Sequence, residues 1–362
     1  MYKYQHGGDV YSNKLAPNGK PFVDFSANIN PLGIPNGVKV ALRNALKQCV
    51  NYPDPFCREL RTATANFLKV AEENIFFGNG AADVLFRLAL ALKPRKALLL
   101  VPTFADYEKA LRSVDCDIEY YYLQEEKAFK VQQDILQAIT SEIDIVVICN
   151  PNNPTGQLTN RELLLEILNK CVEVNAKLLI DECFMDFVDE AKAFSMRVLL
   201  EQYPNLIILK AFTKTFAIPG VRLGYCLCAD QELHENLHRC GQDWSVSILA
   251  QEAGKAALLE KKKKKKSFEL IQRERKYLIR HLKCLGAKIY GSEANYIFFK
   301  MKQPKNLVEV LKEQGYLIRS CANYHNLGED YYRIAVKVRC FNYGLIKAIM
   351  EEKKDAFFTN DY

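Results

Sequence analysis

The sequence has 362 residues, of which 49% are hydrophobic, enough for a large domain with a substantial core and a smaller one beside it. The formal net charge is +7, but the lysine run at 261–266 carries nearly all of this excess and no aromatic residues interleave it, so a nucleic-acid-binding protein is not favoured. The twelve cysteines form no Cys-x-x-Cys pair, and no signal sequence or long apolar span is recognisable. We therefore expect a reduced, cytoplasmic protein without a membrane or nucleic-acid partner.

Short apolar runs alternate with amphipathic helical patterns between about residues 78 and 259. This alternation predicts an α/β fold, with a mostly parallel central sheet sandwiched by helices. Ligands of such folds bind at the carboxyl ends of the strands. The predicted strands are 97–101, 143–149, 177–180, 206–209 and 223–228, and the predicted helices are 82–92, 105–112 and 160–174.

The last third of the chain predicts a smaller α+β domain after one long helix. Its expected elements are that helix at 247–284, a strand at 296–300, a helix at 307–313, strands at 316–320 and 331–336, and a final helix at 343–352. We expect residues 1–45 to join this small domain, residues 46–245 to form the large binding domain, and residues 246–362 to form the linking helix and the small domain.

Two motifs near the first strands suit a phosphorylated ring compound. Gly78-Asn-Gly80-Ala-Ala82 precedes a helical pattern, and small residues at a helix N-terminus let backbone N–H groups approach a phosphate. Phe104 follows Pro102 and Thr103 and could stack on a planar ring. Either motif alone has an ordinary structural interpretation, as a glycine turn or a core phenylalanine.

Two further motifs place polar groups at strand ends. Asn150-Pro-Asn-Asn-Pro-Thr-Gly156 is a rigid turn in which Asn153 can donate a hydrogen bond to a phenolate oxygen. Asp181 ends a buried apolar run, where a carboxylate is costly unless it has a partner. A protonated pyridine nitrogen would be such a partner, and a helix N-cap is the alternative.

Lys214 and Arg222 supply the remaining groups of this chemistry. Lys214 follows the apolar run at 206–209, and a partly unprotonated lysine there can form a Schiff base with a carbonyl. The fork of Arg222 suits a phosphate. An aldehyde and a phosphate on one molecule describe pyridoxal 5'-phosphate, which is the cofactor that we expect.

Arg319 and Arg333 lie in apolar, strand-like segments, where an arginine needs an anion such as a substrate carboxylate. Ordinary surface arginines are the alternative. His234-Glu-Asn-Leu-His238 matches a zinc-protease pattern, but its segment is polar and no third ligand is in register. We expect a polar surface helix there and no metal.

Together these motifs, in this order along nearly the whole chain, resemble the fold-type I pyridoxal-phosphate enzymes in the branch of the histidinol-phosphate aminotransferases. Tyr52 resembles a tyrosine that reaches the cofactor of the neighbouring subunit, which implies a homodimer. The resemblance assigns the cofactor phosphate to Ala81, Ala82, Thr213 and Arg222, and it counts Gly80 among the cofactor-binding residues. It assigns the ring nitrogen to Asp181, the ring oxygen to Asn153, ring stacking to Phe104 and the Schiff base to Lys214, with Lys214 and Asp181 as catalytic residues.

Within this branch, His6-Gly-Gly8, the segment 25–33, Trp244-Ser-Val246 and the segment 318–324 look more like the threonine-phosphate decarboxylases of cobalamin synthesis. Phe184 stands where the aminotransferases usually have a tyrosine. Ala211 and Asp9 depart from the pattern of the decarboxylases, which have a hydroxyl residue and an asparagine there. The resemblance assigns the substrate to His6, Asn28 and Arg319, which would bind its phosphate, to Arg333, which would bind its carboxylate, and to Asn153.

The resemblance thus implies decarboxylation of a small phosphorylated hydroxy-amino acid, O-phospho-L-threonine, to (R)-1-aminopropan-2-yl phosphate. Three alternatives stay open: a histidinol-phosphate aminotransferase, an O-phospho-L-serine decarboxylase giving ethanolamine phosphate, and a cofactor-binding regulator without turnover. Phosphothreonine and phosphoserine differ by one methyl group, worth about 1 kcal/mol of burial. The order of motifs does not record such a difference.

Overall fold

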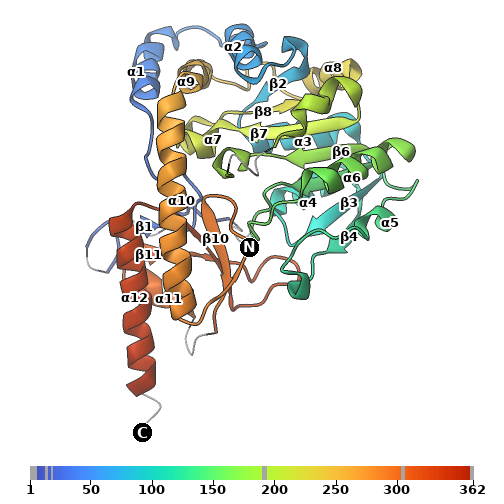
Figure 1. Ribbon diagram of the computed structural model, residues 1–362. Coiled ribbons are helices and arrows are strands. Elements are labelled where there is room, and N and C mark those ends of the chain that lie inside the picture. The colour runs from blue at the N-terminus through green and yellow to red at the C-terminus, as the bar shows by residue number, and fades with distance from the viewer. Residues whose placement is uncertain (1–5, 13–14, 18, 190–193, 303–305, 359–362) are drawn as a thin grey trace.

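The computed structural model describes residues 6–12, 15–17, 19–189, 194–302 and 306–358. A seven-stranded sheet and a smaller sheet lie at opposite ends of the molecule, and the long helix α10 (Lys261–Cys284) runs beside both (Figure 1). None of the helices in the described ranges has the length and apolar character needed to cross a membrane.

The large sheet has the strand order β2-β8-β7-β6-β5-β3-β4. Only β8 runs antiparallel to its neighbours, so the predicted mostly parallel sheet is confirmed. The central strands are continuous apolar runs because helices cover both of their faces. The strands are β2 (Ile75–Gly78), β3 (Lys96–Val101), β4 (Asp117–Tyr122), β5 (Ile145–Cys149), β6 (Lys177–Asp181), β7 (Leu206–Ala211) and β8 (Gly224–Leu227).

Each face of this sheet has its own hydrophobic core. Helices α3 (Ala81–Leu92), α4 (Ala105–Arg112) and α8 (Gln231–Arg239) pack on one face, and α2 (Arg58–Leu68), α6 (Arg161–Glu173) and α9 (Ile248–Leu258) pack on the other. The side chain of Asn160 caps α6 by accepting a hydrogen bond from the Leu163 amide. The short elements are α5 (Ile135–Ala138), α7 (Phe212–Thr215) and the 3₁₀ turns Leu46–Gln48, Glu72–Asn74, Glu125–Lys127, Met185–Phe187, Met196–Gln202 and Pro219–Val221.

The small sheet is antiparallel, in the order β12-β13-β10-β9. Its strands are β9 (Lys288–Tyr290), β10 (Tyr296–Lys300), β12 (Arg319–Ser320) and β13 (Tyr331–Ala335), and helices α11 (Leu307–Glu313) and α12 (Arg339–Phe358) belong to the same part of the chain. Part of the N-terminal segment contacts this part of the chain, because β1 (Val23–Asp24) pairs in parallel with β11 (Tyr316–Leu317) and Phe25 is in the same hydrophobic core. The domain boundaries at residues 45 and 245 stay a prediction.

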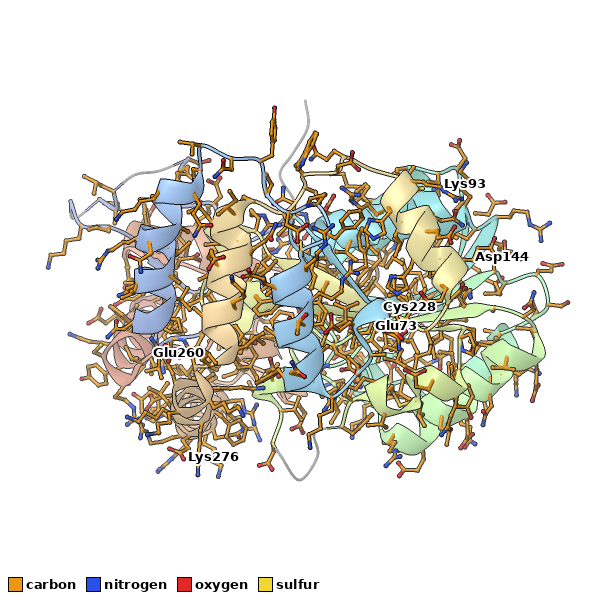
Figure 2. The ribbon with its side chains drawn as sticks, turned by 90° about the horizontal axis from the view of Figure 1, so that it is seen from above. Glu73, Lys93, Asp144, Cys228, Glu260 and Lys276 are labelled. Atoms are coloured by element: carbon orange, nitrogen blue, oxygen red, sulfur yellow. The ribbon has the colours of Figure 1, made fainter. Side chains whose placement is uncertain are left out.

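Two predicted elements are interrupted. The expected strand at 316–320 divides at the buried Ile318 into β11 and β12, which belong to different sheets. The expected helix at 247–284 ends at Leu258 and restarts at Lys261. At this break the Glu260 carboxylate accepts a hydrogen bond from the Gly37 amide (3.1 Å) near the start of α1 (Asn36–Ala45), which lies beside α9 (Figure 2). The Glu260 side chain thus connects the break between the two helices to α1.

Strands β2 and β4 were not among the strands predicted from the sequence. β2 has only four residues, and β4 is an edge strand whose residues alternate between exposed and half-buried, so neither shows the long apolar run of a central strand. Helices α1 and α2 were not predicted either.

Candidate active site

A cavity of about 350 Å³ opens at the carboxyl ends of β3, β5, β6 and β7. Every predicted site residue except Gly80 and Tyr52 lines it, although these residues come from distant parts of the chain. The lining residues that the sequence predicted are His6, Asn28, Ala81, Ala82, Phe104, Asn153, Asp181, Thr213, Lys214, Arg222, Arg319 and Arg333.

Lys214 lies on the single helical turn α7 that follows β7. Its amine is surrounded by protein, and burial is the main cause that lowers its pKa below the ordinary value. Cys183 and Asp181 oppose this lowering, while the charges of Arg333 and Arg222 add to it. Among the described residues no carboxylate forms an ion pair with it. The unprotonated amine is the form of lysine that attacks a carbonyl carbon, and a lowered pKa increases its fraction.

Lys210, four residues earlier in strand β7, has the opposite electrostatic surroundings. Burial alone would lower its pKa, but the carboxylates of Asp186 and Glu182 outweigh this effect and raise it. Lys210 Nζ lies 3.7 Å from Glu182. Lys210 therefore stays protonated, and of these two lysines only Lys214 is suited to be a nucleophile.

Asp181 ends β6 and is 7% exposed. Its Oδ2 accepts a hydrogen bond of 2.5 Å from the Tyr107 hydroxyl, and its Oδ1 accepts one of 2.8 Å from the Cys183 amide. Both bonds fix the carboxylate at the cavity wall, where it can face a cationic ring nitrogen.

The start of α3 and the Arg222 guanidinium come together as an anion site. Gly80 is the N-cap residue at a φ of 89°, and no side chain caps the helix, so its first amide groups are available to a ligand. A Cβ at position 80 would collide with Arg222, which places the guanidinium against this helix end. Arg222 Nη1 also donates to the Pro219 carbonyl (3.1 Å). Gly80 itself does not line the cavity, but it lies next to Ala81 and Ala82, which do.

Arg333 is almost fully buried at the opposite wall. Its Nη1 donates to Asn153 Oδ1 and its Nη2 to the Ser26 carbonyl (2.6 Å), while its Nε has no hydrogen-bond partner among the described residues. Because Asn153 Oδ1 accepts the hydrogen bond from Arg333, the Nδ2 group of Asn153 is the part of the amide that can donate to a ligand. Arg333 keeps N–H groups for an anion.

Arg319 and the N-terminal segment form the outer wall. Arg319 pairs with Arg333 across β12 and β13, and its Nη2 donates to Asn323 Oδ1 (2.7 Å). His6 Nε2 lies 3.0 Å from Asp106 Oδ1. Asn28 is buried, and its Oδ1 has no partner within the described residues. His6 would be read as a disordered tail from its position alone, yet it lines the cavity.

The two phenylalanines of the cavity have different surroundings. Phe104 contacts the His6 ring at 5.3 Å and the Tyr107 ring at 5.6 Å. Phe184 is buried edge-on against Tyr296 at 5.0 Å, and the Tyr296 hydroxyl donates to the Asn152 carbonyl (2.6 Å). Phe184 thus presents only carbon to the cavity.

Sequence reasoning missed several lining residues. Tyr107 and Asp106 follow the Pro-Thr-Phe motif on α4, and Ser26 and Tyr324 lie within segments already noted for their resemblance. The side chain of Ser26 accepts from the Gly8 amide (2.7 Å) and so holds the N-terminal segment in place. Only the position of Tyr107 one helical turn from Phe104 could have indicated its role, because both side chains then share a helix face.

Tyr52 lies outside this cavity and is 78% exposed. Its ring stacks on Trp244 with the centroids 4.7 Å apart. Within its own chain Tyr52 therefore contributes nothing to the cavity, and its predicted contact across subunits stays a prediction.

The His-Glu-x-x-His pattern lies on α8, but the expectation of a wholly polar surface helix was wrong in one respect. His234 is buried, with Nε2 3.0 Å from the Cys228 carbonyl oxygen, and His238 packs edge-on against Phe76 at 5.0 Å. Both histidines lie near the core because Leu233 and Leu237, which precede them in the chain, pack α8 against the sheet. Within the described part of the chain no group of three His, Cys, Asp or Glu side chains could hold a metal ion.

Comparisons with known proteins agree with this architecture. The family model for aminotransferase class I and II matches residues 20–339. Threonine-phosphate decarboxylase of Salmonella typhimurium is 35% identical over 353 residues, 96% of each chain. The adenosylcobalamin biosynthesis bifunctional protein of Leptospira interrogans is 28% identical over 95% of this chain and 40% of its own length. The histidinol-phosphate aminotransferase structure from Clostridium acetobutylicum has a TM-score of 0.86 and 29% identity over 92% of this chain and 99% of its own. The chain belongs to the aminotransferase class I and II family, in the group of the threonine-phosphate decarboxylases.

Proposed function

We propose that this protein is a pyridoxal-phosphate-dependent decarboxylase that converts O-phospho-L-threonine to (R)-1-aminopropan-2-yl phosphate for cobalamin biosynthesis. The observation that carries the proposal is the pair Arg319 and Arg333, opposite each other in the same cavity as Lys214. A phosphorylated amino acid brings two anions to one site, and two adjacent guanidinium groups match them. The relatives in Salmonella typhimurium and Leptospira interrogans support this substrate and this pathway.

The cavity fits pyridoxal 5'-phosphate. Lys214 supplies an amine of lowered pKa for the aldehyde, and the start of α3 with Arg222 supplies N–H donors for the phosphate. Asp181 supplies a buried carboxylate for the ring nitrogen, and Asn153 Nδ2 a donor for the ring oxygen. The cofactor, when bound, supplies an electron-withdrawing ring that accepts the electrons of a bond broken at the substrate α-carbon.

Orientation of the substrate decides which bond breaks. We assign the carboxylate to Arg333, whose position is fixed by its bonds to Asn153 and Ser26. We assign the substrate phosphate to Arg319 together with His6 and Asn28. With both ends of the substrate held in this way, rotation about the bond between its nitrogen and its α-carbon would be restricted, so that the bond to the carboxylate would be the one presented for cleavage.

Lys214 has a second task in this proposal. After loss of carbon dioxide, the α-carbon would need a proton. The Lys214 amine, on α7 in the cavity wall, is a titratable group that could supply it. Because burial lowers the pKa of Lys214, Nζ releases a proton more readily than an ordinary lysine amine does. The buried Tyr107 and Asp181 keep the opposite wall of the site in place.

An aminotransferase acting on histidinol phosphate is the second candidate, favoured by the similarity to the Clostridium acetobutylicum structure. The two reactions differ in the α-bond that is aligned. Phe184 argues for the decarboxylase, because the aminotransferases usually place a tyrosine hydroxyl there and Phe184 offers none.

The experiment that tests the proposal is a product assay with the purified holoenzyme. O-phospho-L-threonine should release carbon dioxide and aminopropanol phosphate without any keto-acid acceptor, and O-phospho-L-serine and histidinol phosphate serve as competing substrates. Turnover that requires 2-oxoglutarate and yields glutamate would instead establish the aminotransferase. Preferred release of ethanolamine phosphate from phosphoserine would change the substrate but not the reaction.

We also infer a homodimer. Tyr52 and Trp244 form an aromatic pair on the surface, and Val50 and Phe56 beside Tyr52 in the chain are exposed as well. Exposed aromatic residues in one place mark a surface for protein contact. A second copy of this chain is the partner that would bring Tyr52 to a cofactor site.

A further inference from the structure

The lysine run at 261–266 forms the first turns of α10, and its members do not all point the same way. Lys261, Lys264 and Lys265 line a second cavity, of about 470 Å³, together with Phe268 on the same helix face. Their spacing of three, four and seven residues places all four on one face of the helix. Lys261, Lys262, Lys265 and Lys266 are all exposed, but Lys262 and Lys266 do not line this cavity. Half of the run is therefore directed at a cavity that the proposed reaction does not use.

The walls of this cavity carry an excess of positive charge. Lys210 and Arg197 line it together with the three lysines of α10, and Asp186 is the one carboxylate among the lining residues that the structure describes. Lys210 also pairs with Glu182 (3.7 Å), which does not line the cavity. Lys264 Nζ pairs with Asp186 Oδ1 (2.6 Å), whereas Lys261 and Lys265 have no ion pair within the described ranges. Like charges gathered around one hollow repel each other unless an anion lies between them.

The position of the lysines on the helix adds to this imbalance. The first turn of α10 holds no acidic residue, and the N-cap residue Glu260 makes no side-chain cap bond. Lysines at a helix N-terminus meet the positive end of the helix dipole, where anions are favoured. The lysine cluster is therefore electrostatically unfavourable without an anion, and binding of a negatively charged ligand would relieve the repulsion.

Apart from Ser195, the remaining lining residues are apolar, and three of them carry aromatic rings. Phe67, Phe194 and Phe268 come from three separate segments, and Lys264 Nζ lies 6.0 Å from the centre of the Phe67 ring. Aromatic rings beside a cationic wall suit a ligand that has a planar apolar group and several negative charges. Nucleoside polyphosphates have this chemistry.

We propose that this cavity, lined by Lys261, Lys264, Lys265, Lys210 and Arg197, binds a nucleoside polyphosphate. The site lies behind the catalytic turn. Asp186 Oδ1 pairs with Lys264, its Oδ2 accepts a hydrogen bond from Thr215 Oγ1 (3.0 Å), and Thr215 directly follows Lys214. A ligand at Lys264 would thus be separated from the Schiff-base turn only by Asp186.

The test is ATP binding to the holoenzyme by calorimetry at low ionic strength. The double variant Lys261→Glu/Lys265→Glu should weaken ATP binding by roughly tenfold or more, because two charges facing the ligand change sign. The matched control Lys262→Glu/Lys266→Glu makes the same change of net charge on exposed positions of the same helix and should bind ATP as the parent does. Equal weakening in both double variants would overturn the proposal, since only overall charge would then matter.

Two further measurements distinguish this cavity from the catalytic one and a nucleotide from a bare polyphosphate. ATP could enter the catalytic cavity, so Arg319→Ala is tested as well; loss of ATP binding there, with binding retained in Lys261→Glu/Lys265→Glu, would overturn the proposal. Inorganic triphosphate should bind several-fold more weakly than ATP, because it has no ring to contact the phenylalanines. Equal affinity for triphosphate would overturn the assignment to a nucleotide. None of these readouts depends on turnover, so they are independent of the proposed reaction.

Discussion

Arg319 on β12 and Arg333 on β13 face each other directly in the antiparallel register of the small sheet. Like charges at directly opposite positions destabilise a sheet. Polar groups hold both in place: Arg333 is bound by Asn153 and the Ser26 carbonyl, and Arg319 by Asn323. A pair arranged in this way is suited to a ligand with two anionic groups, which is the chemistry of a phosphorylated amino acid.

Arg319→Ala should raise the KM for O-phospho-L-threonine by roughly a hundredfold, because the substrate phosphate loses a charged hydrogen-bonding partner. Arg319→Lys should restore part of this loss, since it keeps the charge without the planar fork. Steady-state kinetics with both variants measures this. Unphosphorylated threonine should be a poor substrate for the parent and for both variants; a parent that uses threonine as well as its phosphate contradicts the assignment.

Lys214→Ala should abolish the covalent link to the cofactor, although Lys210 remains in the same part of the chain. Burial lowers the pKa of Lys214, whereas Asp186 and Glu182 raise that of Lys210, so Lys210 cannot take over at neutral pH. Borohydride treatment followed by mass spectrometry should find the cofactor on Lys214 in the parent and on no lysine in the variant. A labelled Lys210 peptide in either protein would show that the assignment is wrong.

Tyr107→Phe removes the hydroxyl that donates to Asp181 and keeps the ring that packs in the core. A hydrogen bond to a charged group contributes roughly 1.5–3 kcal/mol, so we expect kcat to fall by about tenfold or more. The KM for substrate should change little, because Tyr107 acts through the position of Asp181. A rise in KM with unchanged kcat would place Tyr107 in substrate binding instead.

Glu125, in the 3₁₀ turn that follows β4 of the large sheet, contacts residues of the small sheet. Its carboxylate accepts hydrogen bonds from the hydroxyls of Tyr290 and Tyr331 and pairs with Lys288 (2.9 Å) and Lys300 (3.1 Å). The Tyr290 hydroxyl, followed by that of Tyr331, holds the pKa of the Glu125 carboxyl well below its usual range. A lowered folded-state pKa stabilises the fold above the unfolded pKa of about 4.3, and this stabilisation is lost as pH falls toward the folded pKa.

Glu125→Gln should therefore lower the free energy of unfolding by roughly 1–3 kcal/mol at neutral pH. The difference from the parent should shrink as the pH falls below about 4, where the parent carboxylate also begins to lose its advantage. Urea unfolding at several pH values measures it. The exposed neighbour Glu126→Gln serves as the control, and a difference that grows toward acid pH would contradict stabilisation by the ionised Glu125 carboxylate.

Mixing Tyr52→Phe protein with Lys214→Ala protein should restore part of the activity that each lacks. If Tyr52 completes the site of the partner, a hybrid dimer has one site with both defects and one with neither. Activity of the mixture after subunit exchange, beside sedimentation analysis of the parent, measures this. A monomeric parent, or a mixture no more active than its components, would remove Tyr52 from the site.

The sequence by itself determined the order of the elements and the groups that end the strands. The apolar runs at 97–101 and 206–209 become β3 and β7, Asp181 ends β6, and Lys214 follows β7, as the chain order predicted. These properties are local: burial on both faces requires continuous apolar runs, and parallel strands bring their carboxyl ends to one edge. The resemblance to a known family rested on the same local motifs.

The tertiary structure alone decided which side chains meet. The contacts of Arg333 with Asn153, of Tyr107 with Asp181 and of His6 with Asp106 join residues far apart in the chain. Neither propensity nor hydrophobic periodicity encodes such pairs, because a hydrogen bond depends on how two separate elements are packed to within a few tenths of an ångström. For the same reason, the sequence predicted only a solvated helix face for the lysine run. In the structure α10 lies against the 3₁₀ turn Met185–Phe187, and three of the six lysines line a cavity there.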